Sequence, residues 1–106
     1  MKKLLSALLT VLPITTYAQT QKDEACSSFT EFSAAVMFAR QSGLSFKDAK
    51  SIAIDSANGN EIEGKIKTVI TEEAYRRTKY QKLENQKNAI HNFAAEMAYF
   101  CEVNYK

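Results

Sequence analysis

Apolar residues recur at steps of three and four positions along most of this chain, which is the spacing of one face of an α-helix. The longest series lies near the C-terminal end and contains Tyr80, Leu83, Ile90, Ala94, Met97 and Cys101. Only Lys87 interrupts this series, Phe93 and Phe100 lie beside it, and the segment contains neither Gly nor Pro. The pattern predicts a long C-terminal helix within 80–101 that packs the domain together, with the turn into it in the polar stretch 78–82.

Two shorter helices are predicted in the first half of the chain. The first covers 26–42 and has an apolar stripe flanked by Cys26 and Met37, formed by Phe29, Phe32, Val36 and Ala39. Gly43 follows it and suits the left-handed position after a last helical turn. The second covers about 46–56, with an inner face of Phe46, Ala49, Ile52 and Ala53. Ser45 precedes the second helix and can cap its free N–H groups.

A third helix is predicted over about 61–77, after the turn signal Asn58-Gly59-Asn60. Its expected buried stripe is Ile62, Ile66, Val69, Ile70 and Ala74. The pattern as a whole predicts an all-α fold, a small bundle of about four helices. The length allows one small domain.

The first 18 residues have the features of a signal peptide that is cleaved on export. Lys2 and Lys3 precede an apolar run from Leu4 to Leu12, and Thr16-Tyr17-Ala18 suits cleavage. The run is shorter than the roughly 20 residues that a membrane-spanning helix needs. A retained N-terminal anchor is the alternative. We therefore expect a periplasmic or secreted protein without a transmembrane segment in its mature chain.

After cleavage, the mature chain is expected to have a flexible N-terminus over 19–25 and a single helical domain over 26–106. The whole chain has 14 Lys and Arg against 12 Asp and Glu. Lys2 and Lys3 lie in the signal, which contains no acidic residue, so the mature chain is close to neutral. This balance gives no reason to expect nucleic acid as a partner.

Cys26 and Cys101 are the only cysteines, and they lie near opposite ends of the mature domain. Disulfides persist outside the cytoplasm, and two cysteines form at most one intramolecular bridge. Closing a loop of about 75 residues would stabilise the fold by roughly 4.5 kcal/mol in the chain-entropy model. The bridge would place the first and last helices side by side and antiparallel. Two free thiols or an intermolecular bridge are the alternatives.

Short motifs occur along the mature chain in this order: Cys26, Val36-Met37, Arg40-Gln41, Gly43, Ala74-Tyr75, Gln86, Ala89-Ile90, Phe93 and Cys101. The series resembles a group of small secreted proteins encoded by bacteria, phages and prophages, with the pattern Cys, VM..RQ.G, AY, Q..AI..F and a final Cys. This chain departs from that group in having Arg76-Arg77 after the AY pair, where the group has a Pro. The resemblance implies export, the bridge and a helical fold, and it implies no catalytic residue.

His91 is the only histidine, and a catalytic histidine normally has a partner that orients it. None of its helical neighbours is a carboxylate: they are Lys87, Asn88, Ala94 and Ala95. One histidine and two bridged cysteines cannot supply a usual zinc ligand set. Neither Glu61 with Glu63 nor Glu72 with Glu73 forms an opposed pair of carboxylates on a helix. We therefore predict no catalytic residue, no metal and no cofactor.

Basic residues are concentrated in the segment 65–87, at Lys65, Lys67, Arg76, Arg77, Lys79, Lys82 and Lys87. Tyr75 and Tyr80 lie among them, and such mixtures can bind anionic polymers. Arg40 and Gln41 close the first helix, where they either hydrogen-bond a neighbouring loop or contact a partner. The candidate partner-binding residues are Arg40, Gln41, Tyr75, Arg76, Arg77 and Lys79.

The sequence does not identify a biochemical function. Its features favour a small exported, non-enzymatic protein of the cell envelope that binds another protein, as an inhibitor, an immunity-like protein or an accessory factor. The alternative is a module that binds polyanions or the envelope surface through the basic segment 65–87. The partner's identity and the oligomeric state do not follow from the sequence.

Overall fold

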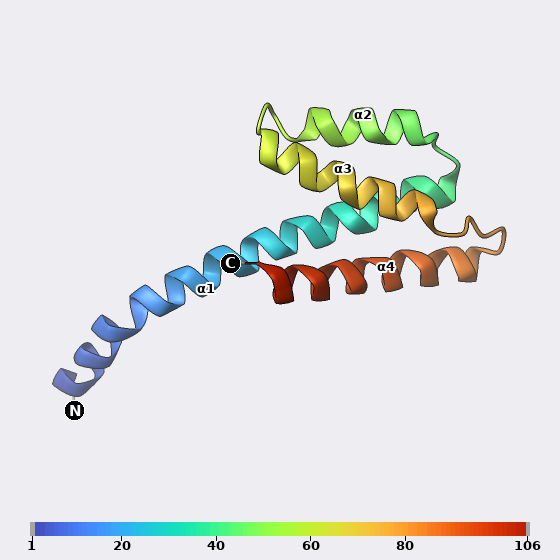
Figure 1. Cartoon of the computed structure of the whole chain (residues 1–106). Helices are drawn as coiled ribbons and strands as arrows, with labels where there is room; N and C mark the ends of the chain where they lie inside the picture. The colour runs from blue at the N-terminus through green and yellow to red at the C-terminus, as the bar shows by residue number, and fades with distance from the viewer. Residues whose placement is uncertain (1, 106) are drawn as a thin grey trace.

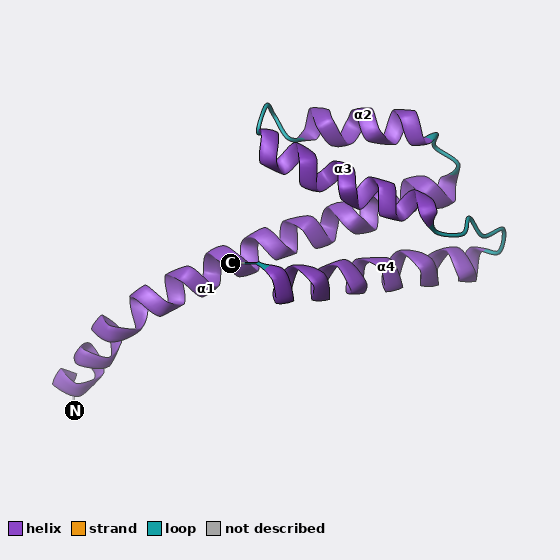
Figure 2. Cartoon of the chain, viewed as in Figure 1, coloured by secondary structure: helices purple, strands orange, loops and turns teal. Residues whose placement is uncertain are grey.

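The computed structural model describes residues 2–105, with side chains from residue 19 onward. This part of the chain forms four helices and no strand (Figure 2). The helices are α1 (Lys2–Ser42), α2 (Phe46–Ser56), α3 (Glu61–Arg76) and α4 (Leu83–Asn104). The predicted all-α bundle is confirmed. The side chains of the predicted signal peptide lie outside the described residues.

Helix α1 is the central element of the bundle (Figure 1). Helix α4 runs antiparallel along its C-terminal half, and the α2–α3 hairpin packs on another side of it. The N-terminal part of α1 projects away from the other helices (Figure 1). Residues 26–42 of α1 are therefore the centre of the bundle. Helix α4 packs on one side of them and the α2–α3 hairpin on another.

The disulfide Cys26–Cys101 is formed, with the two Cα atoms 5.6 Å apart, as the sequence predicts. An ion pair between Lys22 and Glu102 lies beside it, with Nζ and Oε2 3.3 Å apart. The segment 19–25, expected to be flexible, is helical and continues α1. The ion pair to α4 and the bridge at Cys26 give this polar segment contacts that the sequence pattern does not show.

Six buried residues from all four helices form the core: Val36, Met37, Ala49, Ile70, Ala74 and Phe93. Partly buried apolar side chains pack around them, among them Phe32 of α1 and Leu44 of the α1–α2 turn. Gly43 has a φ of 93° and ends α1, as expected for a left-handed residue after the last turn. The Ser45 hydroxyl accepts a hydrogen bond from the Asp48 N–H and caps α2, as predicted.

The predicted face of the last helix is partly wrong. Helix α4 begins at Leu83, so Tyr80 belongs to the preceding loop. Leu83 is 64% exposed, whereas Phe93, which the pattern places beside the stripe, is 1% exposed. The helix starts late because 77–82 is used to cross from α3 to α4. Only the middle of α4 then faces the core.

The predicted stripe of α3 is also partly wrong. Ile62 is 73% exposed and Val69 is 59% exposed, while the buried face contains Lys67, Ile70, Thr71 and Ala74. The reason is that α3 packs against α2 on one side and α1 on another, and no helix covers the Ile62 side. Ile52 of α2 is exposed for the same reason, since α2 packs through Ala49, Ala53 and Ala57.

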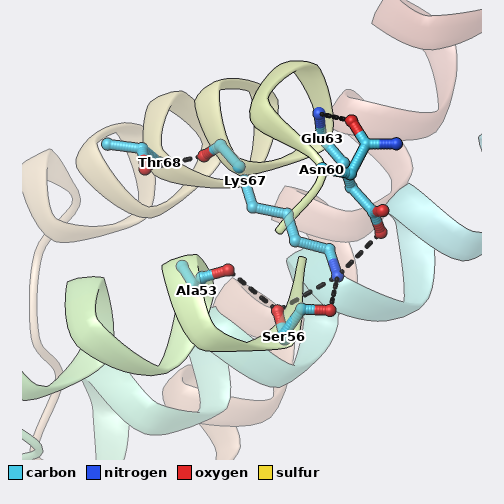
Figure 3. Close-up of polar contacts among 7 residues, drawn as sticks. Ala53, Ser56, Asn60, Glu63, Lys67 and Thr68 are labelled. Carbon is cyan, nitrogen blue, oxygen red and sulfur yellow. Dashed lines mark hydrogen bonds and ion pairs between the residues drawn. The ribbon is translucent and has the colours of Figure 1, made fainter. Parts of the chain in front are cut away.

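Lys67 is a buried lysine that the basic-segment interpretation did not anticipate (Figure 3). Its ammonium lies 3.0 Å from the Glu63 carboxylate and 3.0 Å from the Ser56 hydroxyl, to which it donates. It also lies 5.3 Å from the centre of the Phe32 ring. Lys67 therefore joins the end of α2 to α3 and α1, and this position has a structural role.

The disulfide makes a first testable prediction. Replacing both Cys26 and Cys101 by Ala should lower the free energy of unfolding by up to about 4.5 kcal/mol, because the unfolded chain is no longer closed over the 75-residue separation. Thermal and denaturant unfolding of the oxidised protein, the reduced protein and the double variant would measure this. Identical melting temperatures before and after reduction would contradict it.

Candidate functional site

The end of α1 is joined to the α3–α4 connection by the side chain of Gln41, which is only 4% exposed. Its Nε2 donates to the Thr78 carbonyl at 2.8 Å, and its Oε1 accepts from the Tyr80 N–H at 2.8 Å. Nε2 also lies 3.4 Å from the Met37 sulfur. One buried amide thus satisfies two backbone groups of a loop that has no regular secondary structure.

Arg40 bonds the same connection from the exposed side. Its Nε and Nη2 each donate to the Arg77 carbonyl at 3.3 Å. The guanidinium carbon lies 5.3 Å from the centre of the Tyr75 ring, in the range of a cation–π contact. The sequence left two roles open for Arg40 and Gln41: bonding a neighbouring loop or contacting a partner. In the structure both side chains hydrogen-bond the α3–α4 loop. For Gln41 these contacts and its burial leave no surface for a partner.

A cavity of about 570 Å³ lies where the α1–α2 turn meets the last turn of α3. We call it the cationic cavity; it is lined by Arg40, Gly43, Leu44, Ser45, Phe46, Glu72, Tyr75, Arg76 and Lys79. Four of the six predicted partner-binding residues line it, although they come from two separate parts of the sequence. Its volume lies in the range of small-molecule sites, and it opens widely to solvent.

The positive charge of the cationic cavity is only partly balanced. Among the described residues, Arg40 and Lys79 make no ion pair, and Glu72 is the one carboxylate in the lining. Arg76 pairs with Glu73, which is not part of the lining. Three cationic side chains therefore face a space with a single carboxylate.

Tyr75 forms a fixed wall of the cationic cavity. Its hydroxyl donates to the Leu44 carbonyl at 2.8 Å, and its ring lies 5.5 Å from the Phe46 ring with the planes tilted by 55°. Burial raises the pKa of the Tyr75 hydroxyl, the nearby Arg40 opposes this, and Asp48 adds to it. The hydroxyl therefore stays protonated and keeps donating to the loop at neutral pH.

Arg77 lies outside the cationic cavity and joins α3 to α4. Its Nη1 and Nη2 donate to the two Glu96 carboxylate oxygens at 2.8 and 3.0 Å. Its guanidinium carbon is 5.2 Å from the centre of the buried Phe93 ring. The hydrogen bond lowers the pKa of Glu96 and raises that of Arg77.

Four of the seven basic side chains in the predicted basic segment 65–87 are paired with carboxylates of this chain. Lys65 pairs with Glu61, Lys67 with Glu63, Arg76 with Glu73 and Arg77 with Glu96, in contacts at four places along α3 and α4. In the part of the chain that the structure describes, the remaining cations have no ion pair: Lys79, Lys82 and Lys87.

A second concave region lies between α3 and α4, and the sequence pattern did not predict it. This apolar groove has a volume of about 740 Å³ and is lined mainly by Phe29, Ile66, Val69, Ile70, Met97, Phe100, Cys101 and Tyr105. Phe29 comes from α1, and charged side chains of Lys65, Glu73 and Arg77 also line it. The groove exists because α3 and α4 pack on α1 and only weakly on each other.

His91 is exposed. Within residues 2–105 no group of His, Cys, Asp and Glu side chains is placed to hold a metal ion. No helix in the described part of the chain has the length and apolar character needed to span a bilayer.

Comparison of the chain with protein-family models, with curated proteins and with solved structures gives no match. The resemblance to small secreted bacterial and phage proteins therefore stays a prediction from its motifs. The structure does give several of those motifs a physical role, because Gln41 and Arg40 bond the α3–α4 connection, and Gly43 ends α1.

The Arg77–Glu96 ion pair predicts a pH dependence of stability. The lowered pKa of Glu96 means that the pair stabilises the fold above the ordinary glutamate pKa of about 4.3, and that this contribution is lost as the pH falls through the lowered value. Glu96→Gln should therefore cost up to about 1 kcal/mol near pH 7, since the pair is half-exposed.

Urea unfolding of the wild type and of Glu96→Gln near pH 7 and near pH 3 would measure the two differences. The difference should be smaller at the lower pH, because part of Glu96 is then protonated in the folded protein. Glu31→Gln is the matched control, because Glu31 is exposed and makes no ion pair among the described residues. A cost of Glu96→Gln that persists unchanged at the lower pH would contradict the assignment.

Proposed function

We propose that this protein is an exported, non-enzymatic factor of the cell envelope that binds another protein, and that the cationic cavity is its recognition site. The observation that carries the proposal is that Arg40, Arg76, Lys79 and Tyr75 line one cavity with a single carboxylate, and that the Arg40 guanidinium lies over the Tyr75 ring. Arg and Tyr side chains are over-represented at the energetic centres of protein interfaces.

The chemistry of the cationic cavity defines the partner surface that would fit. Arg76 and Lys79 offer charged donors, and Phe46 with Tyr75 offers an aromatic wall. An acidic side chain next to an apolar one matches both features. The wall is held by the Tyr75 and Arg40 bonds to the neighbouring backbone, so little ordering is needed on binding.

Two features support an extracytoplasmic role. The predicted signal peptide directs export, and the Cys26–Cys101 bridge is of the kind that persists in oxidising compartments. An inhibitor or immunity-like protein of the periplasm would combine such a stapled fold with a preformed recognition site.

The alternative, binding of an anionic polymer by the basic segment 65–87, has less support. A polymer-binding surface needs a continuous row of available cations. Four of the seven basic side chains are paired with carboxylates of this chain, and Lys67 is buried.

The proposal predicts that charge reversal in the cationic cavity removes partner binding without unfolding the protein. Arg76→Glu with Lys79→Glu should abolish capture of a partner from periplasmic extract, because both cations become carboxylates. Lys82→Glu with Lys87→Glu is the matched control, since these exposed lysines lie outside the cavity and the charge change is equal. Capture with tagged protein and mass spectrometry would compare the variants.

Thermal melting of each variant checks that the fold is kept. A protein captured equally by the wild type and both variants would contradict the assignment of the site. Retention on heparin that falls steeply with salt, and that the Lys82 and Lys87 variant loses as well, would favour the polyanion alternative.

A further inference from the structure

Glu72, the single carboxylate in the lining of the cationic cavity, makes no ion pair in the described part of the chain. It lies four residues before Arg76 on α3, so the two side chains share one face of the helix and are within reach of each other. Arg76 pairs with Glu73 instead. Glu72 is half-buried, and partial burial of a charge costs free energy unless an opposite charge compensates it. A positively charged group of a ligand would supply that compensation.

Two cations of the same cavity, Arg40 and Lys79, also lack an ion pair among the residues whose side chains are described. The Arg40 guanidinium lies over the Tyr75 ring, and the Lys79 ammonium lies 3.5 Å from the place that a Cβ atom would take on Gly43. Both cations are therefore close to the end of α1. Neither pairs with Glu72, although all three side chains line one space, so the cavity presents opposite charges that are apart from each other.

The shape of the cationic cavity indicates which kind of ligand fits. It opens widely to solvent, whereas small-molecule sites cover most of the surface of their ligand. A segment of a protein can insert a few side chains and close the opening with the surface around them. The tilted rings of Phe46 and Tyr75 offer an apolar wall to one of those side chains. The matching ligand is therefore a protein segment that has an apolar side chain and charges of both signs.

We propose that the cationic cavity recognises a dipolar segment of the partner, in which an apolar side chain has an acidic and a basic side chain beside it. The acidic group binds Arg40 and Lys79, and the basic group binds Glu72. The inference rests on the proposed function and adds the basic group to it. A segment with acidic groups alone would leave Glu72 next to a like charge, which opposes binding and selects against such partners.

Titration with short peptides, followed by NMR of the purified protein, would test this inference. The probe is a tripeptide with capped ends that holds Phe between Asp and Lys, in either order. Its two relatives have Asn in place of Asp, or Gln in place of Lys. We expect the dipolar peptide to shift the Gly43 and Tyr75 amide resonances and to bind about two- to fivefold more tightly than either relative, since each relative loses one exposed ion pair.

Variants of the cavity assign each preference to a side chain. Glu72→Gln should bind the dipolar peptide and the peptide without Lys equally, because the group that selects the basic side chain is gone. Lys79→Gln should reduce the preference over the peptide without Asp. Glu31→Gln is the matched control, since Glu31 is exposed, lies outside the cavity and makes no ion pair among the described residues, and it should keep both preferences.

Three results would overturn the inference. The first is a preference for the dipolar peptide that stays unchanged in Glu72→Gln. The second is a peptide without Lys that binds the wild type at least as tightly as the dipolar peptide does; the proposed function would survive this result, because the cations would still select the acidic group. The third is the absence of any shift of the cavity amides with any of the peptides up to about 10 mM. Capture of a partner from periplasmic extract tests the proposed function separately in that case.

Discussion

The buried amide of Gln41 determines how the rest of this fold is joined. Its two hydrogen bonds hold Thr78 and Tyr80 against the end of α1, at the point where the chain turns from α3 into α4. At the other end of α4, the Cys26–Cys101 bridge ties the last turn to α1. Helix α4 is therefore attached to α1 at both ends, and Phe93 is buried between these two attachments.

The cationic cavity follows from this attachment. Because Arg40 bonds the Arg77 carbonyl and Tyr75 bonds the Leu44 carbonyl, the α1–α2 turn and the end of α3 are held at a fixed separation. The space between them is lined by Arg76, whose guanidinium pairs with Glu73, and by Lys79, which has no ion pair among the described residues. The side chains that hold the loop and the cations that line the cavity therefore lie close together.

Much of this architecture could be predicted from the sequence, and the exceptions have physical reasons. Short stretches of sequence encode local backbone and covalent chemistry. This explains why the helix spacing, the Asn58-Gly59-Asn60 turn, the Ser45 cap, the Gly43 helix end and the cysteine bridge could all be predicted. The buried faces are harder to predict, because an apolar stripe does not say which neighbour covers it. Ile62 is exposed since nothing packs on that side of α3, and Lys67 is buried since α2 supplies a hydroxyl and a carbonyl for its ammonium.

The candidate site also depends on helix packing, which the local sequence does not predict. Arg40, Tyr75, Arg76 and Lys79 could be chosen by residue type, but their convergence depends on the pairing of α1 with α3. Arg77 was grouped with them by sequence adjacency, and the extended backbone at that residue turns its side chain to Glu96 instead. The apolar groove could not be foreseen, because it arises from the weak contact between α3 and α4.

The role of Gln41 can be tested most directly by amide hydrogen exchange at Tyr80. Tyr80 lies in a loop, and its N–H donates to the Gln41 side chain, whereas the neighbouring Lys79 and Gln81 amides have no acceptor among the described residues. We expect the Tyr80 amide to exchange far more slowly than those two neighbours in the wild type and at their rate in Gln41→Ala. Equal exchange at all three amides of the wild type would contradict the claim that this side chain holds the connection.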